Sequence, residues 1–441
     1  MYGQDTIVAV ATGAGRSAIA VLRLSGPQTR AILEAVMGSV PKPRMASLRA
    51  IRALDGTVLD RALVLYFASP ASFTGEEVAE FHLHGGQAVV SAVMRRLVET
   101  GLCRLAEPGE FSRRAFLNGK LDLAEAEGIA DLIDAETEAQ RRQAIRQLEG
   151  SLSQAVESWR ARLIDAMALT EASLDFSDEG DVPEGLIEEA VEIVAAVQNE
   201  LISALDDNRS GERLREGFTV VIVGAPNVGK STLLNRIAGR DVAIVSPIAG
   251  TTRDLIELRC DLSGTPVVFV DTAGLRETSD PIEREGVERA RKRADAADLV
   301  LYLTDNDSAC APIIPHTELG TGSVDTLIVC TKSDLQPTAE AQIAVSAKTG
   351  EGIDQLLALI EQRIASTYGG QTALVTRERH RIAFLDAKAH LSRVVGARPN
   401  MPPELLAEDI RLGTRALGRI TGRVDVEEVL DRLFSGFCIG K

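Results

Sequence analysis

The stretch Gly224-Ala-Pro-Asn-Val-Gly229-Lys230-Ser231 decides the fold of the middle of this chain. It fits the pattern G-x-x-x-x-G-K-[ST], with the β-branched run FTVVIV before it and the helical run STLLNRIAG after it. In such a loop, glycines let successive backbone N–H groups wrap a phosphate at a helix N-terminus. Lys230 supplies a positive charge to the outer phosphates, and the Ser231 hydroxyl reaches Mg²⁺. The stretch therefore predicts a P-loop between a strand and a helix.

Three later motifs indicate which nucleotide this loop holds. Asp271-Thr-Ala-Gly274 ends a strand, where an Asp can hold Mg²⁺ through water and Gly274 can offer a backbone N–H to the terminal phosphate. Thr331-Lys332-Ser333-Asp334 follows, and its last residue can accept two hydrogen bonds from a guanine edge, which adenine cannot donate. Ser346-Ala347-Lys348 completes the series. The motifs predict GTP as the ligand.

Two segments bear on hydrolysis. Gly250-Thr-Thr-Arg-Asp254 lies where a mobile loop brings a Thr hydroxyl to Mg²⁺, and Thr252 is the candidate ligand. Leu275 stands where well-known small G proteins have the glutamine that orients water, so another group must position water here. Arg253 and Arg276 remain candidates for an arginine finger, and a bound cation is the alternative.

The patterning along the 441 residues predicts a multidomain chain with α/β and α parts. Short β-like runs separated by Gly and Pro predict a small α+β domain, and long helical periodicity follows it. Apolar β-branched runs alternating with helices then predict a Ras-like P-loop G domain with a parallel sheet, inserted into a helical domain. The expected boundaries are 1–118 for the N-terminal domain, 119–216 and 367–441 for the two helical parts, and 217–366 for the G domain.

Charge and cysteine usage narrow the functional classes. The net charge of −16 argues against broad nonspecific binding to a polyanion, which is driven by Lys and Arg. Residues 1–120 carry 14 Lys and Arg against 10 Asp and Glu, so nucleic acid is expected to prefer this third or one local face. Five scattered cysteines indicate neither a disulfide framework nor a zinc site. Without a basic leader or a bilayer-length apolar run, we expect a cytoplasmic protein that does not enter membranes.

The motifs N-x-G-K-S, GTTRD and DTAGLRE resemble those of the potassium-activated G proteins. Further stretches narrow the resemblance to the MnmE (TrmE) family of tRNA-modification GTPases, and it covers essentially the whole chain. They are FTGEE from Phe73, HGG with Gly85 and Gly86, EPGEFSRRAFLNGKLDLAEAEGIADLIDAET at 107–137, and the terminal FCIGK from Phe437.

The resemblance implies a function as well as a fold. It implies a homodimer whose N-terminal domains dimerise and bind a tetrahydrofolate derivative, in the 5,10-methylene or 5-formyl form. With an FAD- and NADH-using partner protein, MnmG, in a heterotetramer or larger complex, such enzymes modify carbon 5 of the wobble uridine of certain tRNAs with an aminomethyl-type group. Potassium and magnesium ions are the other cofactors implied.

The resemblance also implies site residues in this chain. The magnesium ligands are Ser231 and Thr252. The catalytic residues are Glu283 and Cys438. The folate contacts are Arg23, Glu80, Lys120 and Lys441, and the potassium ligands are Asn227, Ser246, Ile248 and Thr251. The GTP-binding set is Asn227, Val228, Gly229, Lys230, Ser231, Thr232, Ser246, Pro247, Ile248, Ala249, Gly250, Thr251, Thr252, Asp271, Thr272, Ala273, Gly274, Thr331, Lys332, Asp334, Ser346, Ala347 and Lys348.

Several of these residues have an alternative structural role. Glu283 is interpreted as the residue that positions water, and the alternative is that it closes a capping box with Asp280 ahead of Pro281. Cys438, needed for the modification but not for GTP hydrolysis, can instead be a buried inert thiol. Arg23 and Lys120 can be ordinary solvated charges. His82 and His84 are interpreted as structural, because no nucleophile or metal-ligand spacing accompanies them.

One residue departs from the family pattern. Thr331 replaces the Asn of N-K-x-D, which keeps a hydroxyl but loses the amide that links guanine to the nucleotide loop. Guanine specificity is then expected to depend mainly on Asp334 and the Ser346-Ala347 backbone. Two other functions remain open: a ribosome-assembly or other RNA-bound GTP switch, and a folate-dependent one-carbon transferase with a merely regulatory G domain.

Overall fold

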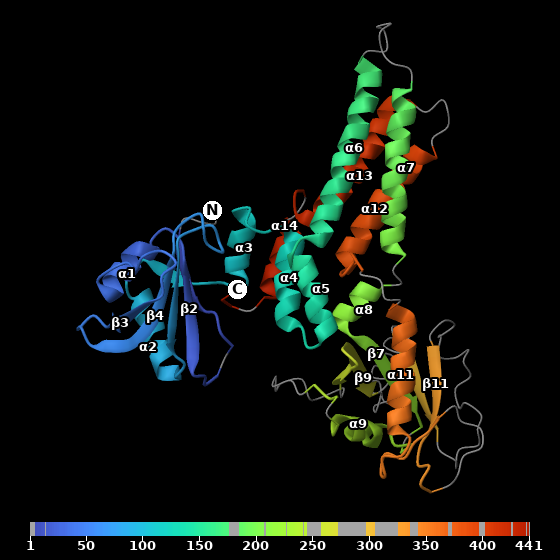
Figure 1. The fold of residues 1–441 in the computed structure, drawn as a ribbon, viewed down its shortest axis with the longest axis horizontal. Coiled ribbons are helices and arrows are strands. Elements are labelled where there is room, and N and C mark those ends of the chain that lie inside the picture. Colours follow the sequence, from blue (N-terminus) through green and yellow to red (C-terminus); the bar gives the residue numbers. More distant parts are fainter. Residues whose placement is uncertain are drawn as a thin grey trace, which may run out of the picture. The chain divides into compact units, whose positions relative to one another are not determined.

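The N-terminal part of the computed structural model is a six-stranded sheet with two helices on one face (Figure 1). The strand order is β3-β4-β5-β2-β1-β6, and every pair is antiparallel except β1 with β6. Leu22 and Leu24 pack against Ile32 and Leu97 between sheet and helices. The elements are β1 (Thr6–Val10), β2 (Ile19–Ser25), α1 (Thr29–Met37), β3 (Ser47–Arg52), β4 (Val58–Phe67), β5 (Val78–His84), α2 (Gln87–Val98) and β6 (Cys103–Leu105).

Between the N-terminal sheet and the G domain, and again after the G domain, most described residues lie in helices. The longest is α6 (Ser151–Asp175), which lies alongside α13 (Pro403–Thr421) (Figure 1). Within the helical part predicted at 119–216, the chain breaks at Thr137 and at Gly150, and new helices begin directly after these residues. The other helices are α3 (Glu110–Leu117), α4 (Leu123–Asp134), α5 (Glu138–Leu148), α7 (Leu186–Leu205), α8 (Ser210–Glu216), α12 (Glu378–Val395) and α14 (Glu427–Ser435).

A second six-stranded sheet forms the G domain, in the order β12-β11-β10-β7-β9-β8. Its strands are parallel apart from β8, which runs antiparallel to β9 at one edge. The P-loop fold predicted from the sequence is confirmed. The elements are β7 (Phe218–Gly224), α9 (Lys230–Ala238), β8 (Glu257–Leu262), β9 (Thr265–Asp271), β10 (Leu299–Thr304), β11 (Asp325–Cys330), β12 (Ile343–Ala344) and α11 (Ile353–Tyr368).

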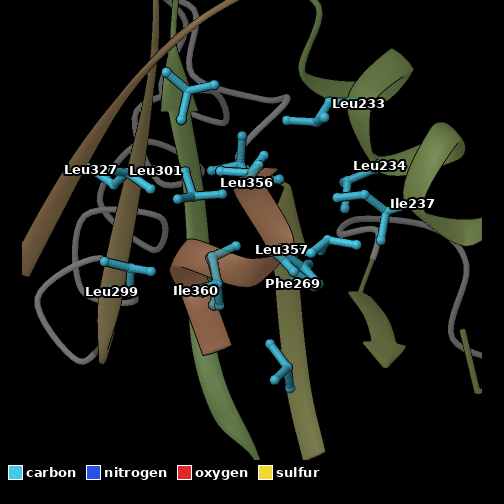
Figure 2. Close-up of a cluster of buried hydrophobic side chains, with 14 of the residues drawn as sticks. Leu233, Leu234, Ile237, Phe269, Leu299, Leu301, Leu327, Leu356, Leu357 and Ile360 are labelled. Carbon is cyan, nitrogen blue, oxygen red and sulfur yellow. The ribbon is translucent and has the colours of Figure 1, made fainter. Parts of the chain in front are cut away.

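The core of the G domain fixes the two helices against this sheet. Leu301 and Phe269 on the strands contact Leu234 of α9 and Leu357 of α11 within one buried cluster (Figure 2). Because α9 starts at Lys230, this packing holds the P-loop at the carboxyl end of β7. In a parallel sheet, ligands bind at that end of the strands.

The structure describes residues 5–13, 15–175, 185–206, 209–225, 227–240, 242–244, 257–271, 297–304, 325–335, 343–368, 373–396, 402–424, 427–437 and 439–440. The chain divides into two compact units. One comprises Met1–Ala130, Gln147–Val194 and Ala389–Lys441, and the other Asp131–Arg146 and Ala195–Lys388. Over the described ranges, none of the helices has the length and apolar character needed to cross a bilayer.

Candidate functional site

The P-loop starts where β7 ends. Gly224 has a φ of +158°, and a Cβ on it would lie 2.6 Å from the Leu303 carbonyl oxygen of the neighbouring strand. Asn227 adopts a left-handed conformation with a φ of 63°. Gly229, with a φ of 107°, directly precedes helix α9, so backbone N–H groups of the loop gather at the helix N-terminus. The loop therefore has the geometry of an anion cradle.

Lys230, at the end of the P-loop, is hydrogen-bonded to residues at the start of the loop. Its ammonium group donates hydrogen bonds to the carbonyl oxygens of Gly224 at 2.8 Å and of Ala225 at 3.0 Å. Burial lowers the pKa of Lys230, and the charge of Asp271 opposes that shift. A partly desolvated ammonium at a phosphate-sized loop attracts an anion more strongly than a solvated one does.

Ser231 and Asp271 meet beside the loop, as the magnesium prediction requires. The Ser231 hydroxyl donates to Asp271 Oδ2 at 2.9 Å. Asp271 is 1% exposed, and among the described residues its Oδ1 has no hydrogen-bond partner. A buried carboxylate oxygen without a donor is costly unless a cation or water approaches it. Hydroxyl and carboxylate oxygens are ligands that Mg²⁺ prefers, so these two residues fit the ion.

Thr331 links the base-reading segment to the P-loop, although the replacement of Asn by Thr was expected to remove this link. Its hydroxyl donates to the Val228 carbonyl oxygen of the P-loop at 2.6 Å, and its backbone N–H donates to the Thr304 carbonyl oxygen at 2.8 Å. The side chain is buried, so competing water is excluded. The hydroxyl thus ties the base-reading segment to the phosphate loop, although it offers no amide to the base.

Asp334 is held ready to accept hydrogen bonds. The Ser346 hydroxyl donates to Asp334 Oδ1 at 2.7 Å, and this bond lowers the pKa of the carboxyl group below its usual value. The Thr349 N–H in turn donates to Ser346 Oγ at 3.2 Å. An ionised carboxylate can accept hydrogen bonds from the two adjacent N–H donors of guanine.

One residue that contributes to this site was not predicted from the sequence. Arg236, on the P-loop helix α9, donates from Nη2 to the Thr349 carbonyl oxygen at 3.1 Å. Thr349 belongs to the loop that carries Ser346, so the arginine links the phosphate helix to the base-reading loop. Arg236 follows Lys230 by six residues, but no motif marks it.

Two replacements of Thr331 distinguish the contribution of its hydroxyl group to nucleotide binding from that of its side-chain volume. Thr331→Val leaves the buried Val228 carbonyl oxygen without its donor, a loss of about 1–3 kcal/mol, so affinity for GDP should fall about tenfold or more. Thr331→Ser keeps the hydroxyl and should bind within about threefold of the original protein. Fluorescent-GDP titration measures both variants. Equal affinity of the Val and Ser variants would show that the hydroxyl link contributes nothing to binding.

A second charged centre lies on the N-terminal sheet. Arg23 of β2 faces Glu80 of β5 directly across the strand pair, and its Nε donates to Glu80 Oε1 at 3.0 Å. The Arg23 guanidinium carbon lies 5.4 Å from the Phe73 ring centroid and 5.8 Å from that of Phe111. The pair is less than one quarter exposed. Two predicted folate contacts are therefore brought together, with aromatic rings on the arginine.

Next to this pair, a charge network centred on the buried Arg114 and Glu110 fixes helix α3. Arg114, 1% exposed, donates to Glu110 Oε1 at 2.9 Å and to Asp5 Oδ1 at 2.8 Å. Burial alone would raise the pKa of Glu110, but hydrogen bonds from Arg104 and Arg114 lower it below its usual value. Removing one partner of such a network leaves a buried charge uncompensated. The network therefore fixes Phe111, the residue after Glu110, beneath Arg23.

A pocket of about 630 Å³ lies beside this network. Its lining includes Arg114 of α3, Asn118, which directly follows that helix, and Glu76 and Glu77. Lys120, the third predicted folate contact, packs near the pocket, because a Cβ on Gly75 would meet its Cε at 3.2 Å. The pocket is lined by Pro27, Arg30, Ser69, Gly75, Glu76, Glu77, Arg114, Leu117 and Asn118.

The two histidines of β5 have different surroundings. His84 Nδ1 lies 2.7 Å from Asp60 Oδ1, and the His84 backbone N–H donates to Asp60 Oδ2 at 2.9 Å. His82 lies 3.7 Å from Glu80. Asp60 thereby holds His84, the last residue of β5, by both its backbone and its ring, which agrees with a structural role for His84.

The remaining predicted site residues lie outside the described part of the chain. They comprise the loop from Ser246 to Thr252, the segment Thr272, Ala273 and Gly274, the water-positioning candidate Glu283, and the C-terminal Cys438 and Lys441. Their roles stay predictions.

Comparison with known proteins places these features in one family. The family model for the N-terminus of the GTP-binding protein TrmE matches residues 6–120, and the model for the MnmE helical domain matches residues 123–438. The chain belongs to the MnmE family of tRNA modification GTPases. The MnmE protein of Methylorubrum populi is 56% identical over 442 residues, which cover 99% of this chain and 98% of the relative.

Other matches to known proteins differ in extent. MnmE of Methylobacterium radiotolerans is 54% identical over 448 residues, with both chains covered completely. Among solved structures, Era from Aquifex aeolicus bound to GDP and AlF4⁻ covers 42% of this chain and 69% of its own, at 24% identity and a TM-score of 0.27. The MnmE match thus extends over both compact units.

Proposed function

We propose that this protein hydrolyses GTP as part of the modification of carbon 5 of the wobble uridine in tRNA. The observation that carries the proposal is the joint presence, in one MnmE-family chain, of a P-loop with its Ser231–Asp271 pair and a separate charged centre at Arg23 and Glu80. An RNA-bound GTP switch needs only the first. The second supports chemistry beyond nucleotide binding, and family membership over both parts favours the tRNA-modification assignment.

At the proposed nucleotide site, each described residue has a distinct role. Lys230 and the loop N–H groups bind the phosphates, and Ser231 and Asp271 hold the magnesium ion. Thr331 fixes the base-reading segment to the P-loop, and Asp334 selects guanine. When bound, Mg²⁺ and K⁺ supply positive charge beside the phosphates. Asn227, Ser246, Ile248 and Thr251 are proposed to hold potassium, with Thr252 on magnesium and Glu283 orienting water.

Within the N-terminal domain, we place a tetrahydrofolate one-carbon donor at Arg23, Glu80, Lys120 and Lys441. A carboxylate beside a guanidinium group can accept N–H groups of a pterin-type ring while the arginine stacks on aromatic rings. The proposal includes a homodimer, a complex with the FAD-dependent MnmG, tRNA as substrate, Cys438 acting at the modification site, and a cytoplasmic location. The placement of folate at Arg23 and Glu80 is tested by measuring how much folate the purified protein retains. Glu80→Ala should reduce that amount, and undiminished retention would contradict the placement.

GTP hydrolysis is expected to depend on the monovalent cation. Leu275 cannot orient water, and a potassium ion beside the exposed Asn227 would supply the positive charge that an arginine finger supplies elsewhere. We expect at least about tenfold faster turnover in K⁺ than in Na⁺ at matched ionic strength, a small part of what such a charge can contribute. Asn227→Ala should abolish the difference. Equal rates in the two salts would exclude a potassium ion from the mechanism.

A further inference from the structure

Helix α13 carries a row of arginines at intervals of four residues. The row is Arg411, Arg415, Arg419 and Arg423, of which the first three lie on the helix and the last lies just beyond its C-terminal cap. Four residues of a helix correspond to a rise of about 6 Å and to little more than one full turn, so the arginines follow one line. Arg419 is half-buried and the other three are exposed.

This row is unfavourable for the helix and unexpected from the composition. Like charges four residues apart on a helix repel one another and destabilise it. The chain as a whole carries a net charge of −16, and residues 121–441 hold 34 Lys and Arg against 54 Asp and Glu. Positive charge that is concentrated locally in an acidic chain indicates that an anion binds there.

A groove lies beside the row, between α13 and α6, which pack against each other within one compact unit (Figure 1). It has a volume of about 340 Å³. Arg411 and Arg415 line it from α13, and Arg160 lines it from α6. Three arginines from two helices therefore border one depression, whose other lining residues are Met167, Thr414 and Val424.

Two carboxylates pair with arginines of this surface in ways that leave the arginines able to bind an anion. Glu157 Oε1 accepts from Arg160 Nη1 at 3.2 Å and lies 2.9 Å from Arg423 Nε, so one negative charge serves two guanidinium groups. Glu408 pairs with Arg411 at 2.6 Å, but these side chains are 45% and 63% exposed. Such an exposed pair contributes little to stability. A phosphate can take the place of a carboxylate on a guanidinium group, because both present oxygens to the same fork of N–H donors.

We propose that the arginine row and the groove beside it bind the phosphate backbone of the tRNA. The inference rests on the proposed function, in which tRNA is the substrate. A nucleic-acid strand repeats its charge at regular intervals, as the row does, so successive guanidinium groups can each reach a phosphate. Contacts to phosphates fix the orientation of a nucleic acid without reading its bases. The surface therefore positions the tRNA and does not select its sequence.

The test neutralises two exposed arginines of the row and two on another helix. The first double variant carries Arg411→Gln and Arg415→Gln. The control carries Arg141→Gln and Arg142→Gln on α5. Arg141 is exposed and paired with a glutamate three residues earlier, as Arg411 is, so both double variants remove two charges and the same kind of ion pair.

Fluorescence anisotropy of a labelled tRNA transcript measures its affinity for the full chain at a series of salt concentrations. Each lost phosphate contact lowers the slope of log affinity against log salt by about 0.7–0.9. We expect the Arg411 and Arg415 variant to lose about 1.5 in slope and about tenfold or more in affinity at about 0.1 M salt. The control should stay within about twofold of the original protein, and GTP hydrolysis should be unchanged in both variants.

A third variant, with Arg411→Lys and Arg415→Lys, keeps the charge and should keep most of the slope. Unchanged affinity and slope in the Gln variant, equal losses in the control, or a full loss of slope in the Lys variant would each overturn the proposal. Retained tRNA binding with lost binding of the FAD-dependent partner would also overturn it, because the row would then dock a protein.

The binding measurement does not depend on the modification chemistry. Normal wobble-uridine modification in a strain that lacks this protein would refute the proposed function, whereas the anisotropy result would still decide whether this surface binds tRNA.

Discussion

Asp334→Asn is expected to shift nucleotide preference from GTP toward xanthosine triphosphate, with a change in the ratio of affinities on the order of a hundredfold. The carboxylate accepts from both N–H groups of guanine, whereas an amide offers one donor and one acceptor, which matches xanthine instead. The Ser346 hydroxyl that holds Asp334 remains available to either side chain. Competition binding against fluorescent GDP gives the ratio directly.

Ser346→Ala is the matched control for this exchange. It removes the hydroxyl that orients Asp334 but leaves the carboxylate in place, so GTP should bind more weakly while staying preferred over xanthosine triphosphate. An Asp334→Asn protein that keeps the original preference for GTP would place the base-reading residue elsewhere.

Lys230→Ala is expected to lower the rate of GTP hydrolysis by about 10²–10³-fold, the usual effect of losing one preorganised group at a developing charge. Two losses combine: the phosphates lose a partly buried ammonium group, and the carbonyl oxygens of Gly224 and Ala225 lose their donor. Single-turnover hydrolysis at saturating protein separates the chemical step from nucleotide binding.

Lys42→Ala serves as the comparison, because Lys42 is an exposed lysine of the N-terminal domain. It should hydrolyse GTP at the original rate. If Lys230→Ala retains more than one third of the original single-turnover rate, the P-loop lysine does not act as described.

The parts of the fold that could be predicted from the sequence are those that depend on consecutive residues. The P-loop depends on consecutive residues, so its glycines, lysine and serine were readable without a structure. The buried strands β7, β9 and β10 were equally clear as apolar runs. Strands β3 and β8 lie at sheet edges with charged residues such as Arg49 and Arg259 in them, and β6 has three residues, so none showed a buried pattern.

Contacts between distant residues explain what the sequence left open. The hydroxyl of Thr331 was evident, but its bond to Val228 joins positions 103 residues apart. Arg23 and Glu80 are opposite each other only because β2 and β5 are neighbours in one register. Arg411 and Arg415 are close in the sequence, but the groove that they line with Arg160 exists only because α13 packs against α6.

The most direct test of the central claim is nucleoside mass spectrometry on tRNA from a strain that lacks this protein. Complementation with the original chain should restore the substituent on carbon 5 of the wobble uridine, and complementation with Lys230→Ala should not. Wobble uridines that keep their substituent after deletion, or that Lys230→Ala restores fully, would contradict a GTP-hydrolysing role in tRNA modification.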